Sequence, residues 1–415
     1  MEAESPSRLV CISCGAEHPS DYRGYRCARC GDLLDVIPKI PEISGWEAFK
    51  GREWGVWRYR EFLPLGYSRR VSLREGGTPL IRCRNLSRWA GVRELYVKFE
   101  GANPTGSFKD RGMTVALTKA VELGAHGVIC ASTGNTAASL AAYAARASLR
   151  SVVAIPEGAI AFGKLFQAIA HGATIVKVRG NFDDALKLVF EAAERLNLYL
   201  LNSVNPWRLE GQKTLAFEVA EELGHDLNIA VPVGNCGNIA AIWKGFKELH
   251  QSGLTGGLPR MIGVQAEGAS PFARLVREGK ETLEPVDKPQ TIATAIRIGR
   301  PVNWKKALRA VKESSGLVET VSDKEILDAQ HALARLEGIG VEPASAAALA
   351  GVKKLAENSE IDIDKPIVCV CTGHLLKDPN PALFKPAHEI EVKPRIEEFL
   401  EKMEKIISPI TNQVL

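Results

Sequence analysis

The sequence predicts two α/β domains built on mostly parallel sheets, preceded by a small cysteine-rich segment. Short apolar, β-branched runs alternate with longer stretches of helical periodicity from about residue 93 onward, which implies crossover connections between parallel strands. At 415 residues the chain is too long for one ordinary hydrophobic core, and it has more candidate strands than one small sheet needs. Paired cysteines near the N-terminus predict the additional segment.

Residues 1–40 contain two cysteine pairs, CISC and CARC, which are Cys11 with Cys14 and Cys27 with Cys30. Twelve residues separate the pairs, a spacing at which four thiolates bind zinc in a tetrahedral site. Because four protein ligands leave no open coordination position, we expect a zinc-ribbon-like segment with a structural zinc ion. The alternative is a segment that folds without metal and keeps its cysteines reduced.

The α/β region follows a linker at residues 37–45, which contains two prolines and ends in glycine. The expected strands are residues 95–99, 127–131, 151–155, 174–178, 229–233, 261–265 and 366–371. The expected helices are residues 112–124, 136–147, 184–196, 213–224 and 344–357. Residues 389–410 are expected to form a terminal helix.

Three of the expected strands run into loops of small residues, at 130–139, 232–241 and 369–378. In parallel sheets ligands bind at the carboxyl ends of the strands, where small residues let the backbone approach a ligand. The loop Gly234–Asn238 fits a phosphate cradle, because an apolar helix with free N–H groups follows it. The alternative for any one loop is a tight strand-to-helix turn.

The stretch NPTGSFKDRG (residues 103–112) places a lysine where a turn-rich loop becomes a helix. Ser107 and Asp110 have the spacing of a capping box, which predicts Lys109 on the first helical turn. The helix dipole disfavours a cation there, and burial in a closed site would disfavour it further. Pyridoxal phosphate needs a neutral lysine amine beside a phosphate cradle, so we expect this cofactor. The glycine spacing fits neither a P-loop nor a dinucleotide fingerprint.

These residues also carry a resemblance to a known family. NPTGSFKDRG resembles the cofactor-lysine motif of the fold type II pyridoxal-phosphate enzymes, which include the tryptophan synthase β chain. Within this fold the resemblance is to the threonine synthases, and it covers about residues 74 to 380. The further stretches that carry it are STGNTAAS, NSVNPWRLEGQKT, GNCGNIAAIWKG, IATAIRIGRPVNW, EPASAAALAG and TGHLLKDP.

The resemblance implies how the chain is divided. Two doubly wound α/β domains would follow the zinc-ribbon-like segment of residues 1–40. A large pyridoxal-phosphate-binding domain would comprise residues 41–114 and 206–385, and a small α/β domain residues 115–205. Residues 386–415 would form a helical tail.

The resemblance also implies roles for residues that match the family motifs. Lys109 would form the Schiff base with the cofactor and then shuttle protons, with Phe108 flanking the cofactor. Asn135 would bond the pyridoxal hydroxyl, and Thr372 the ring nitrogen. The cofactor phosphate would be held, mainly through backbone N–H groups, by Gly234, Asn235, Cys236, Gly237 and Asn238.

Two further groups of residues would bind the substrate. Ser132, Thr133 and Thr136 would lie near its carboxylate or leaving group. Its phosphate would be bound by Ser203, Asn205, Arg208 and Lys213. Arg208 and Lys213 are five residues apart, which is not one helical face, so one of them would act indirectly or a turn would intervene. The alternative for Lys213 is an ordinary solvated lysine.

Two positions depart from the family pattern. Cys236 occupies the phosphate loop where alanine is common, which is tolerable if the loop binds through its backbone. Leu375 follows Thr372, Gly373 and His374 where glycine is common, and we expect it to crowd the side of the ring nitrogen slightly.

The resemblance implies a threonine synthase activity, the conversion of O-phospho-L-homoserine and water to L-threonine and phosphate. Three alternatives remain open at this point. The first is a related enzyme that uses O-phosphoserine to form cysteine or cysteate, and the second is a serine or threonine dehydratase. The third is a zinc-ribbon binding protein on an inactive scaffold, which an intact Lys109 argues against.

Composition bounds the partners and the compartment. A net charge of +4 gives no global field that would attract nucleic acid. No uninterrupted apolar run reaches the about 18 residues of a membrane span, and the N-terminus lacks a secretory signal. An odd total of nine cysteines, several in apolar runs, indicates a reducing compartment, so we expect a cytoplasmic protein. A homodimer is usual for this fold.

Overall fold

The computed structural model describes residues 7–157, 162–379, 384 and 389–407. Contacts between residues divide the chain into two compact units, Met1–Pro379 and Asn380–Leu415. The second unit contains helix α13 (Ile396–Ile407), which confirms the predicted terminal helix there, while residues 408–410 of the expected stretch lie outside the described residues. No helix in the described part of the chain is long and apolar enough to cross a membrane.

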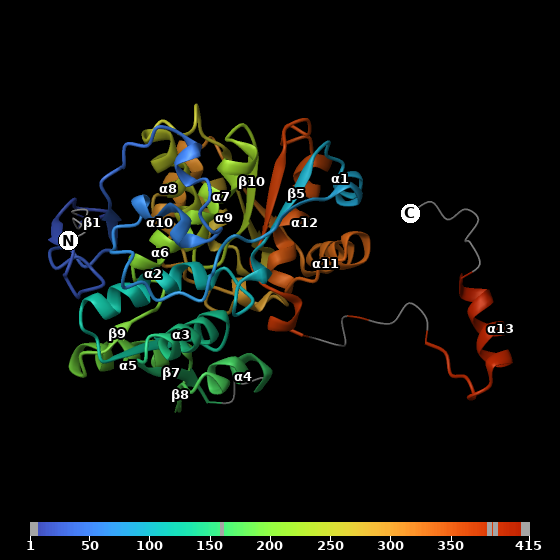
Figure 1. The fold of residues 1–415 in the computed structure, drawn as a ribbon, viewed down its shortest axis with the longest axis horizontal. Coiled ribbons are helices and arrows are strands. Elements are labelled where there is room, and N and C mark those ends of the chain that lie inside the picture. Colours follow the sequence, from blue (N-terminus) through green and yellow to red (C-terminus); the bar gives the residue numbers. More distant parts are fainter. Residues whose placement is uncertain (1–6, 158–161, 380–383, 385–388, 408–415) are drawn as a thin grey trace. The chain divides into compact units, whose positions relative to one another are not determined.

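A six-stranded sheet forms the centre of the first unit (Figure 1). Its order is β12-β11-β10-β13-β5-β4, and every neighbouring pair is parallel except β4 with β5. The strands are β4 (Leu80–Arg82), β5 (Leu95–Phe99), β10 (Asn228–Pro232), β11 (Arg260–Ala266), β12 (Leu317–Val321) and β13 (Ile367–Cys371).

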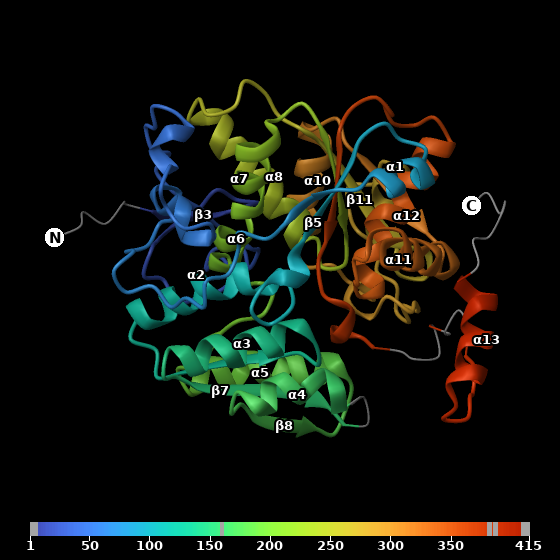
Figure 2. The ribbon, with the colours of Figure 1, turned by 45° about the vertical axis from the view of Figure 1, so that its right-hand side comes forward.

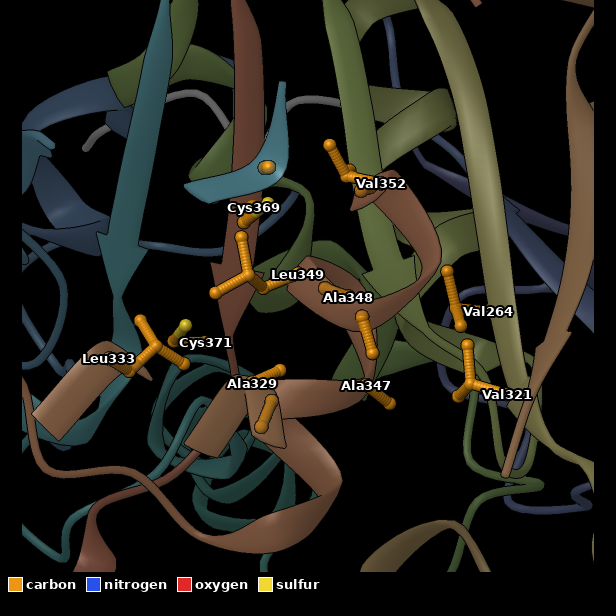
Figure 3. Close-up of a cluster of buried hydrophobic side chains, with 14 of the residues drawn as sticks. Val264, Val321, Ala329, Leu333, Ala347, Ala348, Leu349, Val352, Cys369 and Cys371 are labelled. Carbon is orange, nitrogen blue, oxygen red and sulfur yellow. The ribbon is translucent and has the colours of Figure 1, made fainter. Parts of the chain in front are cut away.

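Both faces of this sheet are buried. Successive side chains of a strand point to opposite faces, so neighbouring residues of one strand pack in different core clusters. Cys369 and Cys371 of β13 pack with Leu349 in one core cluster (Figure 3), while Val368 and Val370 belong to the cluster on the other face. Figure 2 shows α11 and α12 on one side of the sheet, and α7 and α8 on the other. The predicted doubly wound α/β architecture is confirmed.

The helices around this sheet are α1 (Arg84–Ala90), α7 (Thr214–Leu223), α8 (Gly237–Gln251), α9 (Pro271–Arg277), α10 (Trp304–Glu313), α11 (Asp323–Glu337) and α12 (Pro343–Glu357). Six short 3₁₀ helices occur in the connections: Trp46–Phe49, Val56–Phe62, Glu100–Ala102, Glu267–Ala269, Thr294–Ile296 and Leu375–Lys377.

A second, four-stranded parallel sheet has the order β8-β7-β6-β9. Its strands are β6 (Gly127–Ala131), β7 (Arg150–Pro156), β8 (Thr174–Val178) and β9 (Tyr199–Leu200). Its helices are α3 (Asn135–Arg146), α4 (Phe162–Ala170) and α5 (Phe182–Arg195). In Figures 1 and 2, helix α2 (Lys109–Glu122) lies between this sheet and the rest of the first unit.

All seven strands expected between residues 95 and 371 are present, but β4, β9 and β12 were missed. The first two are only three and two residues long. In β12 the polar pair Glu319 and Thr320 interrupts the apolar run that marks a buried strand. Short length and polar residues therefore hid these strands from a periodicity argument.

The cysteine ribbon, residues 8–37, is a separate three-stranded antiparallel sheet in the order β2-β1-β3. Its strands are β1 (Arg8–Cys11), β2 (Glu17–Pro19) and β3 (Leu34–Ile37). It packs against the α/β body, because Leu9, Leu34 and Val36 share a core cluster with residues of α2 and α3.

Two glycines let α2 cross the short helix α6 (Trp207–Gln212) at backbone contact. A Cβ atom on Gly211 would lie 1.6 Å from the carbonyl oxygen of Arg111, and one on Gly112 would lie 2.7 Å from that of Arg208. No real Cβ contact is so short, so neither position accepts a side chain without separating the helices. The crossing brings the start of α2 close to Arg208.

We predict that Gly211→Ala lowers the free energy of unfolding by about 3 kcal/mol, because backbone atoms cannot move aside as side chains can. Thermal or denaturant unfolding measures the change. Gly66→Ala is the matched control, since a Cβ at Gly66 meets nothing within 4 Å. Equal stability of the two variants would contradict the helix crossing.

Candidate active site

Lys109 is the first residue of α2, so its predicted place on the first helical turn is confirmed. The predicted capping box is wrong. Phe108 is the N-cap residue, and the buried hydroxyl of Ser107 has no hydrogen-bond partner. The Asp110 carboxylate instead accepts bonds from the backbone N–H and hydroxyl of Thr105, at 2.7 and 2.6 Å.

The Lys109 amine is buried beside two charged side chains. Burial and, to a smaller extent, the positive charge of Arg208 lower the pKa of Lys109 to about 7, while Glu342 acts in the opposite direction. A helix dipole shifts a pKa by at most about 0.7 unit, so burial is the stronger cause. The Nζ atom lies 4.2 Å from the centroid of the Phe108 ring. At neutral pH the amine is therefore an available nucleophile and base.

A buried network of charges fixes the start of α2. Arg111 pairs with Glu100 at 2.7 Å and with Glu218 of α7 at 2.6 Å, and Lys98 of β5 pairs with Glu218 at 2.8 Å. All four side chains are fully buried. Because Arg111 follows Lys109 by two residues, the network ties the reactive lysine to the central sheet.

Thr372, predicted to bond the cofactor ring nitrogen, lies directly beside this helix start. Its carbonyl oxygen accepts from the backbone N–H of Phe108 at 3.0 Å. Its hydroxyl is 3.0 Å from the hydroxyl of Ser345, which also accepts from the N–H of Gly373 at 2.8 Å. If Ser345 donates to Thr372, the Thr372 hydroxyl hydrogen is free to donate to a ring nitrogen. Leu375 lies beside Gly340, where a Cβ on the glycine would come within 3.3 Å of the Leu375 side chain.

Asn135, predicted to bond the pyridoxal hydroxyl, is the first residue of α3 and donates to both carboxylate oxygens of Glu342 at 3.1 Å. Glu342 is almost completely buried, and burial raises its pKa although the Asn135 bond opposes this. Sequence reasoning missed Glu342 as a site residue, although it begins the stretch EPASAAALAG. A buried-looking glutamate before a proline-started helix was the available signal.

The loop 234–238 has the geometry expected of a phosphate cradle. It follows β10, and Cys236 adopts a left-handed conformation with φ of 63° as the N-cap of α8. A Cβ on Gly234 would come within 3.0 Å of the Cα of Ile296, so the loop is closed on its far side. The Cys236 thiol belongs to the hydrophobic core, which leaves only backbone from this residue for an anion.

Three loops meet at Ser203. The Asn235 side chain lies 3.3 Å from the Ser203 hydroxyl, and the Asn303 side chain donates to the Ser203 carbonyl oxygen at 3.0 Å. The N–H of Asn303 also donates to the Asn235 carbonyl oxygen at 3.1 Å. Asn303 was not predicted as a site residue, although it is the last residue but one of the stretch IATAIRIGRPVNW. The contacts place Ser203 beside the phosphate loop.

Arg208 is a buried cation without a counter-charge in the described part of the chain. Its side chain is 3% exposed, forms no ion pair with any described residue, and donates to the Leu201 carbonyl oxygen at 3.2 Å. Burial lowers its pKa to about 10. Since an uncompensated buried charge is costly, the arrangement favours an anionic ligand.

The side chains of Lys213 and Asn205 are both engaged by partners within the protein. The Lys213 ammonium donates to the Phe62 carbonyl oxygen at 2.9 Å and pairs with Glu210 and Glu248, at 2.6 and 2.7 Å. All its donors are thus engaged within the protein. The Asn205 side chain accepts from the N–H of Trp207 at 3.0 Å and donates to a backbone carbonyl. Both residues hold α6 in place, and we leave them out of the proposed phosphate site.

Of the three residues predicted near the substrate carboxylate, Ser132 and Thr133 lie in the loop between β6 and α3, and Thr136 lies in the first turn of α3. Each of the three is partly exposed. The Ser132 hydroxyl accepts from the N–H of Gly134 at 3.2 Å. The hydroxyls of Thr133 and Thr136 bond to no residue that the structure describes, so they remain available to a ligand.

The residues present fit pyridoxal phosphate. Among the described residues, eight buried side-chain polar atoms lack a hydrogen bond, and half of them belong to this region: Ser107 Oγ, Arg208 Nε and both amide atoms of Asn238. Such atoms are rare in folded proteins unless a ligand satisfies them. A lysine amine of lowered pKa, the N-terminus of α8 and the Thr372 hydroxyl are the kinds of group that the cofactor needs as its amine, its phosphate site and its ring-nitrogen partner.

The four cysteines of the ribbon gather at a second site. The sulfur atoms of Cys11, Cys14, Cys27 and Cys30 all lie within 4.8 Å of one another. His18 Nε2 lies 3.5 Å from the Cys27 sulfur. Four thiolates at such spacing fit a tetrahedral zinc ion, and an imidazole that touches one ligand is a common second neighbour.

Comparisons with known proteins show the family to which the chain belongs. A model of the family described as pyridoxal-phosphate dependent enzyme matches residues 71–373, more than half of the chain. The threonine synthase of Methanocaldococcus jannaschii is 54% identical, covering 92% of this chain and 96% of that protein. The threonine synthase of Methanosarcina acetivorans is 52% identical, covering 90% and 92%. The processed form of threonine deaminase isoform 2 from Solanum lycopersicum is 25% identical with a TM-score of 0.63, covering 72% of this chain and 83% of that one.

We predict that Lys109 of the cofactor-free protein reacts with an acylating reagent along a titration curve centred near pH 7, because only the neutral amine reacts and its pKa is about 7. Labelling at each pH, read by mass spectrometry, gives the midpoint. Arg208→Gln removes a positive charge and should raise the midpoint, while Glu342→Gln should lower it.

Exposed lysines in the same sample are the internal control, with midpoints near ~10.4. A Lys109 midpoint close to theirs, or one that neither variant moves, would contradict the proposed electrostatics.

Proposed function

This chain belongs to the threonine synthases, within the pyridoxal-phosphate dependent enzymes, and we propose that it converts O-phospho-L-homoserine and water into L-threonine and phosphate. The enzyme is a pyridoxal-phosphate-dependent lyase. The substrate assignment is carried by one observation, the buried and unpaired guanidinium of Arg208 beside Lys109.

Two separate anion sites support this substrate. Loop 234–238 at the start of α8 would hold the phosphate of the cofactor through backbone N–H groups. Arg208 and Ser203 would hold a second phosphate, that of the substrate, with Arg208 offering a planar fork of donors. A dehydratase has no phosphorylated substrate and therefore no use for the second site.

When bound, pyridoxal phosphate supplies an electron sink for carbanions that form at the amino acid. Near pH 7 a large fraction of the Lys109 amine is neutral, so it can accept the proton from the substrate α-carbon. It must release this proton before it can accept another from the β-carbon. Asn135, held by Glu342, would orient the pyridoxal hydroxyl, and Thr372 would donate to the ring nitrogen. A hydroxyl does not keep that nitrogen protonated, so the cofactor ring would withdraw electrons less strongly.

Arg208 and Ser203 would retain the phosphate group as its bond to the γ-carbon breaks. Water then adds its hydroxyl at the β-carbon, and its remaining proton leaves with the phosphate. The two protons that Lys109 removes in turn are returned, one to the γ-carbon and one to the α-carbon, so the atoms balance. Thr133 and Thr136, whose hydroxyls are free among the described residues, would bind the carboxylate or the departing group.

The remaining assignments rest on composition and on the cysteine cluster. We propose that the four clustered thiolates hold a structural zinc ion. A reducing compartment such as the cytoplasm suits the nine cysteines, all of which are free thiols in the described structure. The homodimer, the absence of nucleic-acid partners and the division of the α/β region at residues 114 and 206 stay predictions.

We predict that the purified enzyme releases phosphate faster from phosphohomoserine than from phosphoserine. Arg208→Gln should raise KM for phosphohomoserine by about ten- to a hundredfold, the cost of one hydrogen-bonded charge. Arg208→Lys keeps the positive charge but lacks the planar fork of donors, so its KM should lie between those of the wild type and Arg208→Gln.

Cofactor affinity, measured by absorbance titration, is the control. Because Arg208 is assigned to the substrate phosphate, its substitution should leave the cofactor affinity unchanged. An unchanged KM would remove Arg208 from the site. Faster turnover of phosphoserine would favour the related phosphoserine-using enzymes, and ammonia release from serine or threonine without phosphate would favour a dehydratase.

We predict about one zinc ion per chain by elemental analysis of protein purified without chelators. Cys27→Ser should lose most of the metal and melt at a lower temperature, since bound metal contributes folding energy. Cys83→Ser changes a buried cysteine outside the cluster and should keep its zinc. Zinc at background level in the wild type would contradict the assignment.

A further inference from the structure

The cysteine ribbon contacts one end of the segment that contains the proposed substrate-phosphate residues directly, and the other end through Lys244 of α8. That segment runs from residue 197 to residue 213, and Ser203 and Arg208 lie inside it. It comprises β9, the loop at Ser203 and the short helix α6. Figure 2 shows β3 of the ribbon beside α6.

At the first end, two side chains of the ribbon bind the backbone and side chains around β9. The N–H of Leu200 donates to the Tyr25 hydroxyl at 2.6 Å, and the Tyr25 ring packs edge-on against Tyr199 with centroids 6.1 Å apart. The Arg23 guanidinium donates to the Asn197 side chain at 2.8 Å. Tyr25 is therefore part of the support for the strand that leads to Ser203.

At the second end, a chain of charges runs from the ribbon into α6. Lys244 of α8 lies 3.4 Å from the Asp35 carboxylate of β3, and it donates to the Val36 carbonyl oxygen and to the Glu210 carboxylate. Glu210 is fully buried and pairs with Lys213 at 2.6 Å. Removing Asp35 would leave Lys244 with one carboxylate partner fewer.

Helix α6 depends on such contacts for its position. It has six residues and no side-chain cap, far below the about 12 that make an isolated helix stable. Glu210 and Arg208 are two residues apart on this helix, so a shift of one moves the other. The glycine crossing with α2 fixes the spacing of the helices, and the Glu210 contacts limit rotation and sliding along the crossing.

We propose that the cysteine ribbon positions segment 197–213, and thereby sets the affinity of Arg208 and Ser203 for the substrate phosphate. This inference rests on the proposed function, because it assigns a task to the same phosphate site. Asp35 and Tyr25 are positioning residues in it, acting through Lys244 and Leu200, and neither touches the substrate.

Another contact of the ribbon provides a control, because it attaches the ribbon to the rest of the protein without involving segment 197–213. Lys305 of α10 pairs with Asp32 of the ribbon, and no contact of the Lys305 side chain reaches segment 197–213 within the described residues. Lys305→Gln therefore loosens the ribbon without touching the segment. Asp35→Asn keeps the size of the side chain and removes the charge that faces Lys244 and Lys306.

The test measures binding of inorganic phosphate to the holoenzyme by calorimetry, so that it does not depend on turnover. Arg208→Gln first shows that the probe reports on the intended site, by abolishing the heat of binding. Asp35→Asn should then bind phosphate about three- to tenfold more weakly than the wild type, and Lys305→Gln as tightly as the wild type. Tyr25→Phe should also weaken binding, and it serves as the second variant if Asp35→Asn folds poorly.

Steady-state kinetics give the second readout. Asp35→Asn should raise KM for phosphohomoserine by the same factor and change kcat by less than about twofold, a split that a general loss of structure does not produce. Equal phosphate affinity in Asp35→Asn, Tyr25→Phe and wild type would overturn the inference, as would an equal loss in Lys305→Gln. Phosphate binding that ignores Arg208→Gln would overturn it too.

Failure of the proposed function looks different from these outcomes. In that case the wild type binds phosphate but does not turn over phosphohomoserine. Weaker phosphate binding in Asp35→Asn would still support the positioning role.

Discussion

The buried pairing of Arg111 with Glu100 and Glu218 is the interaction on which the site depends. It joins the end of β5, the start of α2 and the middle of α7 in a region closed to water. Breaking such a network by removing one partner costs about 3–5 kcal/mol, since a charge stays buried without compensation. The pairing therefore holds α2 in one orientation, and Lys109 takes its place relative to the sheet from it.

The surroundings of Lys109 serve two purposes at once. The protein excludes water from both the Lys109 amine and the Arg208 guanidinium. As long as no anion is bound, the charge of Arg208 lowers the pKa of Lys109. A phosphate bound at Arg208 would cancel part of that charge. Lys109 would then hold a proton more firmly with substrate present than without it, which suits a residue that must take protons from two carbons in succession.

Periodicity and loop composition predicted the apolar strands and the three ligand loops, because buried parallel strands and their carboxyl ends leave strong local patterns. The capping box failed because its spacing does not reveal that Asp110 bonds to Thr105 instead. Prediction from sequence motifs has a general limit, which is seen at Lys213, Asn205 and Glu342. A motif identifies residues that a site requires, but only three-dimensional contacts separate those that bind a ligand from those that hold a helix or orient a neighbour.

The crossing of α2 and α6 has a consequence for substrate length. Gly112 and Gly211 place two backbones in contact, so the separation of the main-chain positions that carry Lys109 and Arg208 is fixed by the helix crossing. A substrate must span that fixed interval with its carbon chain, from the carbon that loses a proton to the phosphate. Discrimination between homologous phosphoamino acids that differ by one methylene then follows from helix spacing, without any side chain dedicated to measuring it.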